Sequence, residues 1–577
     1  MKTKGDFMDT KAMKNKTDHF AATCSSVISG VISAFLVIVV VTLPLIYDNS
    51  YFNILETKYK CFYMSVLAML AVILVLGLIM LVIDLKEFQG EHAKNLFLAL
   101  KPCNWKQTFC LADGAVIIFW LVSVISTLQS EYLYEAFWGN EGRYSGLFLM
   151  TLYVIMYFVV TRCWHYNKWV MQALFAAGLI VCYIGITDYF QLDILHFRGK
   201  VKPEQSTIFT STIGNINTYT AYVALLMGAA TAMFTTVKGW LKTCWYYLCM
   251  VVSFFAIILG CSDNAYLALG AMFALLPLLV FRNKHGVTRY LVVIATFATV
   301  IQCIDWINQA YADMVIGLDS LFQILVNLPG LLVLVVLLWC LAAGVFYYFR
   351  KKEKENVAAL LSGKKETTEK TAKNMLVRIW LIVIILGLLA VIFMLIDANA
   401  LGHGARYGSL GNYLVFNDSW GTNRGYIWRK SLGLYAAFPF MHKLFGFGPD
   451  TFGIMTTQSF MKDMIGTVGQ VFDTAHNEYL QFLLTIGPIG LLAYLTFLIG
   501  NSWNMAKYWI IQNERNVKTA EAAGLPSECI GAIGCLFAVI CYCAQALVNL
   551  NLPIATPVMW VLMSVGLAAI KNEVKNR

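Results

Sequence analysis

Residues 25–47 read SSVISGVISAFLVIVVVTLPLIY, an apolar stretch without a charged side chain. Charged side chains are also absent from residues 62–83, 331–349 and 379–396. Because a helix rises about 1.5 Å per residue, each stretch is long enough to cross the ~30 Å hydrocarbon core of a bilayer. Backbone polar groups inside lipid need hydrogen-bond partners within the protein, so these stretches predict membrane helices rather than strands.

The composition of the whole chain favours the same fold class. Of its 577 residues, 59% are hydrophobic and 13% are charged, whereas an average soluble protein has about 25% charged residues. We predict an all-α fold, a polytopic membrane bundle of about 14 transmembrane helices, with about 12 as the lower bound. The expected spans lie near residues 25–47, 62–84, 109–128, 144–162, 168–190, 217–237, 243–261, 265–281, 290–305, 326–349, 376–396, 478–502, 527–549 and 553–570.

The net charge of +10 indicates how the bundle faces the membrane. With an even number of spans both termini lie on one side, and most Lys and Arg residues fall in the tails and loops of that side. Because cytoplasmic loops carry such an excess, both termini are predicted to be cytoplasmic and to contact anionic membrane lipid. The first apolar run is too long for the core of a secretory signal. No nucleic-acid partner is expected, because no basic stripe is interleaved with aromatic residues.

These patterns divide the chain into segments. They are a cytoplasmic tail (1–24), N-terminal transmembrane helices (25–349), a flexible Lys- and Glu-rich cytoplasmic linker (350–375), a C-terminal region (376–571) and a second cytoplasmic tail (572–577). The C-terminal region includes a large extracytoplasmic loop at 397–477, and loops of this length are usually functional or disordered. Its aromatic content argues against disorder. Within it, Thr422 is predicted to cap a helix from about 423 to 438.

Familiar motifs of soluble enzymes are missing from the sequence. It has no GxxxxGK[ST] phosphate loop, no HExxH pair and no Cys/His cluster with zinc spacing. The large loop lacks a carboxylate pair spaced to hold a divalent metal, and none of the fifteen cysteines lies within it. We therefore expect no metal, no cofactor and no disulfide framework there.

Three pieces of the C-terminal region stand out: NRGYIWRKS at 423–431, LFGFGPDTF at 444–452 and AHNEYLQFLL at 475–484, the last continuing into GPIGL at 487–491. On these pieces the sequence resembles the O-antigen ligase and polymerase family of bacterial membrane glycosyltransferases. Members of that family have an Arg-x-x-x-Trp element in a large external loop, then a Gly-x-Gly-Pro turn, then a His-Asn pair that opens the next span. All three occur here in that order, so residues 376–571 are interpreted as an O-antigen ligase-like region.

Two further elements are similar to the family, and one departs from it. The run Gly214-Asn215-Ile216-Asn217 has Ile where the family usually has Pro, and Gln545, Asn549 and Pro553 look like the family's last hairpin. Family ligases often carry a Ser-Arg pair at the outer end of a middle span, where this chain has Ser262 and Asp263. A second phosphate-binding arginine is therefore missing from that place. Arg143, which enters its span from the same side, is a candidate substitute.

The resemblance implies a function in polysaccharide biosynthesis for the cell envelope. Such a protein lies in the bacterial cytoplasmic membrane and transfers a glycan from undecaprenyl pyrophosphate to an acceptor hydroxyl on the outer face. The acceptor is a glycan, a lipid or a protein, and both ligation and polymerisation remain open. We expect an inverting, metal-independent glycosyltransferase, with the donor lipid entering sideways between helices.

The resemblance also assigns roles to particular side chains. His476 is the candidate catalytic base, because a neutral imidazole accepts a proton near pH 7 and a helix N-terminus favours the neutral form. Asp473 opposes that effect. Arginines bind phosphate bidentately and stay charged, so Arg424 and Arg143 are the candidate ligands of the donor pyrophosphate. The weaker candidates are Arg429 and Lys430 for the pyrophosphate, and Asn477, Trp428 and Tyr479 for acceptor or sugar contacts.

Simpler interpretations exist for each of these residues and for the whole chain. A loop arginine usually contacts solvent or a lipid headgroup, and aromatic residues at span ends usually form the interfacial belt. The alternative function is a polysaccharide flippase or another transporter of lipid-linked oligosaccharide. Transporters concentrate polar residues within their spans, and these spans hold few. A membrane scaffold in envelope assembly is the third possibility.

Overall fold

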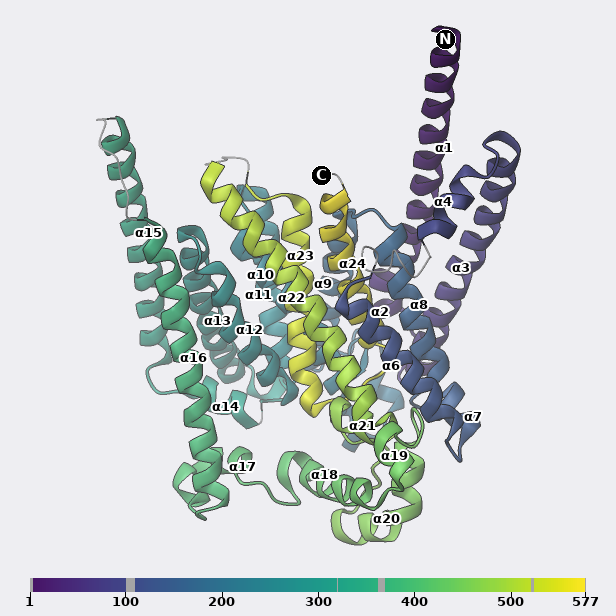
Figure 1. Cartoon of the computed structure of the whole chain (residues 1–577). Coiled ribbons are helices and arrows are strands. Elements are labelled where there is room, and N and C mark those ends of the chain that lie inside the picture. Colours follow the sequence, from purple (N-terminus) through teal and green to yellow (C-terminus); the bar gives the residue numbers. More distant parts are fainter. Residues whose placement is uncertain (1–3, 100–108, 319, 362–368, 520–523, 576–577) are drawn as a thin grey trace.

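The computed structural model describes residues 4–99, 109–318, 320–361, 369–519 and 524–575. Long helices form a bundle, and further helices cover one of its ends (Figure 1). Ten of the described helices are long and apolar enough to cross a membrane, and α8, α12 and α24 are shorter apolar helices. Every predicted span falls on one or more helices, which confirms the polytopic all-α fold class.

The bundle helices share a length of four turns or more. They are α1 (Lys4–Val37), α3 (Ile54–Glu87), α6 (Leu111–Leu128), α8 (Leu147–Cys163), α9 (Trp169–Tyr189), α10 (Ile216–Thr236), α11 (Trp240–Leu259), α12 (Asn264–Val280), α13 (Lys284–Ala310), α15 (Leu331–Leu361), α16 (Glu369–Asn399), α22 (Gly487–Thr519), α23 (Ser527–Gln545) and α24 (Thr556–Lys575).

Shorter elements connect the bundle helices. They are the π-helix η1 (Ile38–Thr42), α2 (Leu43–Leu45), α4 (Glu91–Ala99), α7 (Leu133–Trp138), α14 (Ser320–Val326), α21 (Glu478–Thr485), the 3-10 helices η3 (Arg198–Lys200), η4 (Pro203–Ile208), η5 (Ala312–Met314) and η7 (Ala546–Val548), and the antiparallel strands β1 (Phe209–Thr210) and β2 (Gly214–Asn215).

The core of the bundle is built around α10. The apolar window of α10 is completely buried, and α9, α11, α12, α13 and α23 pack against it. Gly228 allows α10 to approach α23 closely, because a Cβ there would lie 2.3 Å from the carbonyl oxygen of Phe537 on α23. Small residues let membrane helices pack backbone to backbone in this way. In contrast, none of the apolar window of α16 is buried, as expected of a helix that faces lipid.

Residues 400–477 form the layer over one end of the bundle, which we call the cap. It contains η6 (Gly404–Leu410), α17 (Gly411–Leu414), α18 (Trp420–Ala437), α19 (Phe440–Phe445) and α20 (Phe452–Val468). Both chain termini lie at the opposite end of the bundle (Figure 1). The cap therefore faces the side away from the termini, in agreement with the even number of predicted spans.

The linker predicted at 350–375 is partly helical. Helix α15 continues to Leu361 and α16 already begins at Glu369, while residues 362–368 lie outside the described part of the chain. Lys and Glu are good helix formers, and Lys351 pairs with Glu355 one turn later. Likewise, α1 begins at Lys4, so the predicted N-terminal tail is continuous with the first span.

The predicted helix of the cap exists, but its start differs from the expectation. The N-cap residue is Ser419, which makes no side-chain capping hydrogen bond, and Gly421, Thr422 and Asn423 have φ of 58°, 60° and 68°. These left-handed residues form a turn, and the regular helix of α18 begins at Arg424 and ends at Ala437. The prediction that Thr422 is the N-cap residue was wrong, because a local sequence signal does not reveal a turn that tertiary contacts impose.

The predicted span 478–502 is two helices rather than one. Helices α21 and α22 are separated at Ile486, where Gly487 has φ of 70°. A Cβ at Gly487 would lie 2.2 Å from the carbonyl oxygen of Leu444, so the break leaves room for the chain of the cap. Phe447 and Gly448 donate their N–H groups to the carbonyls of Leu484 and Thr485. The Gly-x-Gly-Pro turn is thus seated on the break.

Candidate functional site

His476 lies on a short loop between α20 and α21, and the backbone around it is held from several sides. Its φ is 47°, and the next residue, Asn477, caps α21 by accepting the N–H of Leu480 at 2.9 Å. The indole of Trp428 donates to the carbonyl of Ala475 at 2.8 Å. Such contacts fix the position of the imidazole before any substrate binds.

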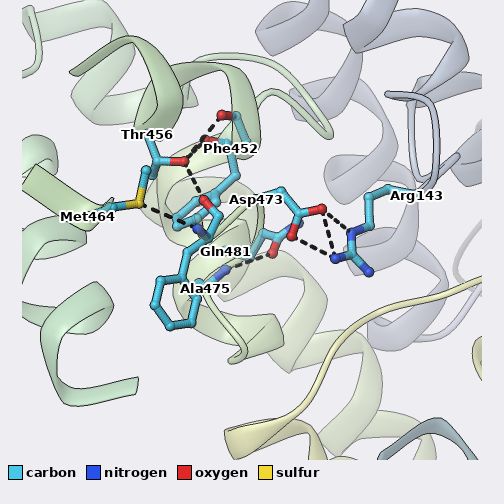
Figure 2. A network of polar contacts seen from close by, with 9 residues as sticks. Arg143, Phe452, Thr456, Met464, Asp473, Ala475 and Gln481 are labelled. Carbon is cyan, nitrogen blue, oxygen red and sulfur yellow. Dashed lines mark hydrogen bonds and ion pairs between the residues drawn. The ribbon is translucent and has the colours of Figure 1, made fainter. Parts of the chain in front are cut away.

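The same loop is anchored to α20 (Figure 2). The Thr456 hydroxyl donates to the carbonyl of Phe472 at 2.8 Å, and the N–H of Phe472 reaches the sulfur of Met464 at 3.4 Å. On the other side, the N–H of Ala475 donates to Gln481 Oε1 at 3.3 Å. The loop is therefore part of the packed structure of the cap rather than a free connection.

The imidazole of His476 is in its neutral form near pH 7. Burial is the main cause that lowers its pKa, to about 3, and the positive charges of Arg424 and Arg143 add to the effect, while Asp473 opposes it. The neutral form was expected from the helix N-terminus, whereas burial and two arginines favour it here. Its Nδ1 atom is buried without a hydrogen-bond partner among the described residues. A neutral imidazole with a free nitrogen is in the protonation state that a base requires, and a bound anion that offsets the two arginines would raise its basicity.

Arg424 is the buried cation of the site. Only 8% of it is exposed, and no carboxylate of the described residues lies within ion-pair distance of its guanidinium. Burial lowers its pKa, and the charge of Asp263 partly compensates. Leaving a buried charge without close compensation is costly, so such a group indicates a place for an anion.

A cavity of about 970 Å³ opens in front of Arg424. Its wall combines bundle helices and cap, including Tyr266 and Leu267 of α12, Val391 and Met394 of α16, and Trp420 of α18. Because α16 exposes its apolar surface, the cavity lies between a lipid-facing helix and a buried cation. The arrangement suits an amphiphile with an apolar chain and an anionic head.

Arg143 reaches the site from the bundle. Its guanidinium forms a bidentate pair with Asp473, with N–O distances of 2.6, 2.8 and 3.1 Å (Figure 2). Asp473 is half-exposed and lies three residues before His476. The positive charges of Arg143 and Arg424 both act on His476, so the three predicted side chains come together although Arg143 is distant from the others in sequence.

Arg429 and Lys430 each have a partner within the cap. Arg429 pairs with Asp418 at 2.6 Å on the surface. Lys430 pairs with Asp463 at 2.6 Å, and the same carboxylate accepts the hydroxyl of Tyr426. These pairs tie α18 to the preceding loop and to α20. Their part in pyrophosphate binding stays a prediction.

The predicted sugar contacts also have internal partners. The Tyr479 hydroxyl donates to the carbonyl of Cys543 at 2.8 Å. The ring of Trp428 packs against Trp420 with centroids 5.2 Å apart, while its indole N–H serves Ala475. Asn477 is occupied as the cap of α21. Each of these side chains has a structural function, and contact with a sugar stays a prediction for all three.

A buried polar network joins three elements that the sequence suggested only separately. Asn264 Nδ2 donates to the carbonyl of Asn217 at 2.8 Å and to Gln545 Oε1 at 3.2 Å. The Ser262 hydroxyl donates to the side-chain Oδ1 of Asn217, and Asn549 Nδ2 donates to the backbone carbonyl of Asn217. This network lies at Ser262, where family ligases often carry a Ser-Arg pair. Amides and a hydroxyl at this place connect the ends of α10, α12 and α23, and no arginine is present there to bind phosphate.

Two buried carboxylates were not singled out from the sequence, although both lie in its quoted motifs. Glu478 accepts hydrogen bonds from Tyr494 at 2.8 Å and Tyr542 at 3.2 Å. Asp450 accepts two backbone N–H groups of the segment that carries Arg143. An acidic residue inside an apolar motif was the available signal.

No group of three His, Cys, Asp or Glu side chains converges as a metal site within the described residues.

The comparison with family models agrees with the motifs. Residues 330–495 match the model described as O-Antigen ligase. The match covers α15, α16, the whole cap, α21 and the start of α22, and so contains Arg424 and His476 but not Arg143. It confirms the resemblance to the O-antigen ligase family, whereas the predicted bounds of the C-terminal region, 376–571, stay a prediction. No curated protein matches the chain.

Proposed function

We propose that this O-antigen ligase-like chain is a membrane glycosyltransferase that moves a glycan from undecaprenyl pyrophosphate to an acceptor hydroxyl on the outer face of the bacterial cytoplasmic membrane. The observation that carries the proposal is that a buried Arg424 lies near a neutral His476 under one cap, close enough for the charge of the arginine to act on the imidazole. Arg424 is suited to bind an anionic leaving group, and His476 is suited to accept the proton of the acceptor hydroxyl. The family match supports the class of reaction, the resemblance to the family implies the donor, and a buried arginine beside an apolar-walled cavity is compatible with that donor.

The chemical step follows from these two side chains. The acceptor O–H gives its proton to the imidazole of His476 while its oxygen attacks the anomeric carbon of the donor sugar. The bond from that carbon to the phosphate oxygen breaks, and its electron pair stays on the pyrophosphate. Because attack and departure occur on opposite faces of the carbon, the configuration inverts. Arg424 and Arg143 stabilise the charge that develops on the leaving group, so the step as proposed needs no metal.

The cavity beside Arg424 supports a lateral path for the donor. An undecaprenyl chain is apolar and stays in the bilayer, while its pyrophosphate must reach the end of the bundle. Val391 and Met394 on the lipid-facing α16 lead to the cavity, and Arg424 lies in its wall. We infer that the lipid lies along α16 and that its head enters below the cap.

The orientation of the chain is part of the proposal. The excess of Lys and Arg on the side of the termini puts both termini in the cytoplasm. The cap then lies on the outer face, where a glycan, lipid or protein acceptor has access. Ligation and polymerisation differ only in the acceptor, and both use the same site.

The test uses the purified full-length protein in lipid vesicles with an undecaprenyl-pyrophosphate-linked glycan. Replacing His476 by Ala should lower transfer about 10²–10⁴-fold, the usual contribution of a positioned base. The matched control is His403→Ala, which changes a partly exposed histidine of the same cap that pairs with Asp397. Unchanged transfer in His476→Ala would exclude the catalytic role. Movement of the lipid-linked glycan across the vesicle membrane without a new glycosidic bond would favour the transporter.

A further inference from the structure

Asp450 is a buried carboxylate that accepts hydrogen bonds from two backbone N–H groups and from the Ser145 side chain, not from a cation. Its Oδ2 atom accepts the N–H of Asn140 at 2.7 Å and that of Ser145 at 3.1 Å. It is 5% exposed, and no basic side chain of the described residues lies within ion-pair distance. Burial raises the pKa of Asp450 to about 6, and the two N–H groups oppose that rise. The proposed chemical step gives this carboxylate no function.

The two N–H groups lie on either side of Arg143 in a tight turn. The N–H groups of Arg143 and Tyr144 both donate to the carbonyl of Asn140 at 3.0 Å. Tyr144 has φ of 56°, a conformation that a bulky residue rarely adopts without support. Asp450 therefore holds both ends of the turn whose middle carries Arg143.

The position of Asp450 depends in turn on the Gly-x-Gly-Pro motif. The N–H of Gly448 is bound to the carbonyl of Thr485, at the break before α22. A Cβ at Gly448 would lie 2.7 Å from the hydroxyl of Ser130 and 3.0 Å from the Cβ of Ala136. The motif thus fits between the helix break and the segment at 130–145. It connects the matched region, which ends at 495, to an arginine outside it.

We propose that Asp450 is a positioning residue, which orders the Asn140–Ser145 turn so that Arg143 is presented to the donor pyrophosphate beside His476. The proposal rests on the proposed function for the role of Arg143. The Gly-x-Gly-Pro-Asp motif then acts through the geometry of a distant loop rather than by touching the substrate. The turn itself is a structural claim that can be tested without any substrate.

The first measurement is hydrogen–deuterium exchange of the reconstituted full chain. In Asp450→Ala, the amides of 140–145 should exchange faster, because two of them lose their acceptor. Asp450→Asn keeps an oxygen acceptor and should give intermediate exchange, which also covers the case that Asp450→Ala does not fold. The matched control is Asp313→Ala, an exposed aspartate at the same end of the bundle. Wild-type protection in both Asp450 variants would overturn the proposal.

The second measurement is a double-mutant cycle on transfer. Asp450→Ala and Arg143→Ala should each raise the donor KM, and the double variant should be no slower than Arg143→Ala alone, because one residue acts through the other. Effects that multiply would overturn the positioning role. If Arg143→Ala transfers normally, the proposed role of Arg143 fails, whereas faster exchange of the turn in Asp450→Ala would still support the structural half of the proposal.

Discussion

Each end of the bundle holds an arginine away from bulk solvent, partly buried in one case and buried in the other, and the two differ in what neutralises them. At the end that carries the termini, Arg162 pairs with the fully buried Asp113 at 2.6 Å, and Asp113 also accepts the hydroxyl of Tyr157 and the N–H of Cys110. Under the cap, Arg424 is buried without a carboxylate in ion-pair distance among the described residues. The first arginine belongs to a completed structural network, and the second faces a cavity.

The difference teaches how to separate a structural charge from a functional one. A membrane protein tolerates a buried charge when partners satisfy it, as at Asp113. An arginine that is buried with only the more distant charge of Asp263 to compensate it lowers stability unless a ligand binds. The second arrangement at the site, Arg143 with Asp473, is intermediate, because the arginine has a carboxylate partner and that partner is half-exposed.

Replacement of Arg424 by Ala gives the largest expected effect on this comparison. Transfer should fall about 10²-fold, because one preorganised donor to the leaving group is lost. Thermal stability in detergent should stay equal or rise, since a buried charge without a close partner is removed. Transfer is measured in vesicles and unfolding by a thermal shift. A large loss of stability together with normal transfer would assign Arg424 a structural role.

The matched control is Arg162→Ala at the other end of the bundle. It removes the ion-pair partner of the buried Asp113 and leaves only the charge of Lys571 to act on that carboxylate, so the protein should lose up to about 3 kcal/mol of stability. Transfer per folded molecule should remain near the wild-type rate, because the pair lies at the far end from the cap. If both variants behaved alike, the distinction between the two arginines would not hold.

Much of the fold could be predicted from local patterns. Apolar stretches such as 25–47 indicated every bundle helix, because lipid requires long apolar helices whatever the tertiary arrangement. Local signals failed where distant chain segments decide the backbone. The break at Gly487 exists because the carbonyl of Leu444 needs the space, and the left-handed turn at Gly421–Asn423 places Arg424. Neither contact is written in the neighbouring residues.

The candidate site was predictable only where a motif pointed to it. Arg424 and His476 lie in family motifs, and Arg143 was inferred by replacing a missing arginine with another cation on the same side. The structure brings these three together, but their catalytic and binding roles stay predictions. Asp450 and the turn at Asn140 are far apart in sequence, so no spacing rule connects them. Such pairings need the folded chain.

The acid dependence of transfer tests whether the cap keeps His476 neutral. An ordinary histidine of pKa about 6.5 would be roughly tenfold less active as a base at pH 5.5. In the folded chain the pKa is about 3, so kcat/KM should stay flat between pH 7.5 and 5.5. Arg143→Ala removes one positive charge, so its acid limb should move to higher pH. The free energy of unfolding should depend on the same imidazole. Below pH about 6.5 the unfolded chain binds a proton that the folded chain does not bind, so the folded state becomes less stable as the pH falls from there. A wild-type acid limb near 6.5 would contradict a buried neutral base.

The smallest expected effect belongs to Arg429, which sharpens the comparison from the opposite direction. Its partner Asp418 and its own side chain are both on the surface, where an ion pair contributes little. Arg429→Ala should therefore change transfer at most about fivefold, the scale of one exposed pair. Asp418→Ala serves as the control, since it breaks the same pair and leaves the cation free. The contrary outcome is that Arg429→Ala loses as much transfer as Arg424→Ala while Asp418→Ala does not. Arg429 would then leave Asp418 to bind the donor, and an ion pair would not identify an arginine of the cap as structural.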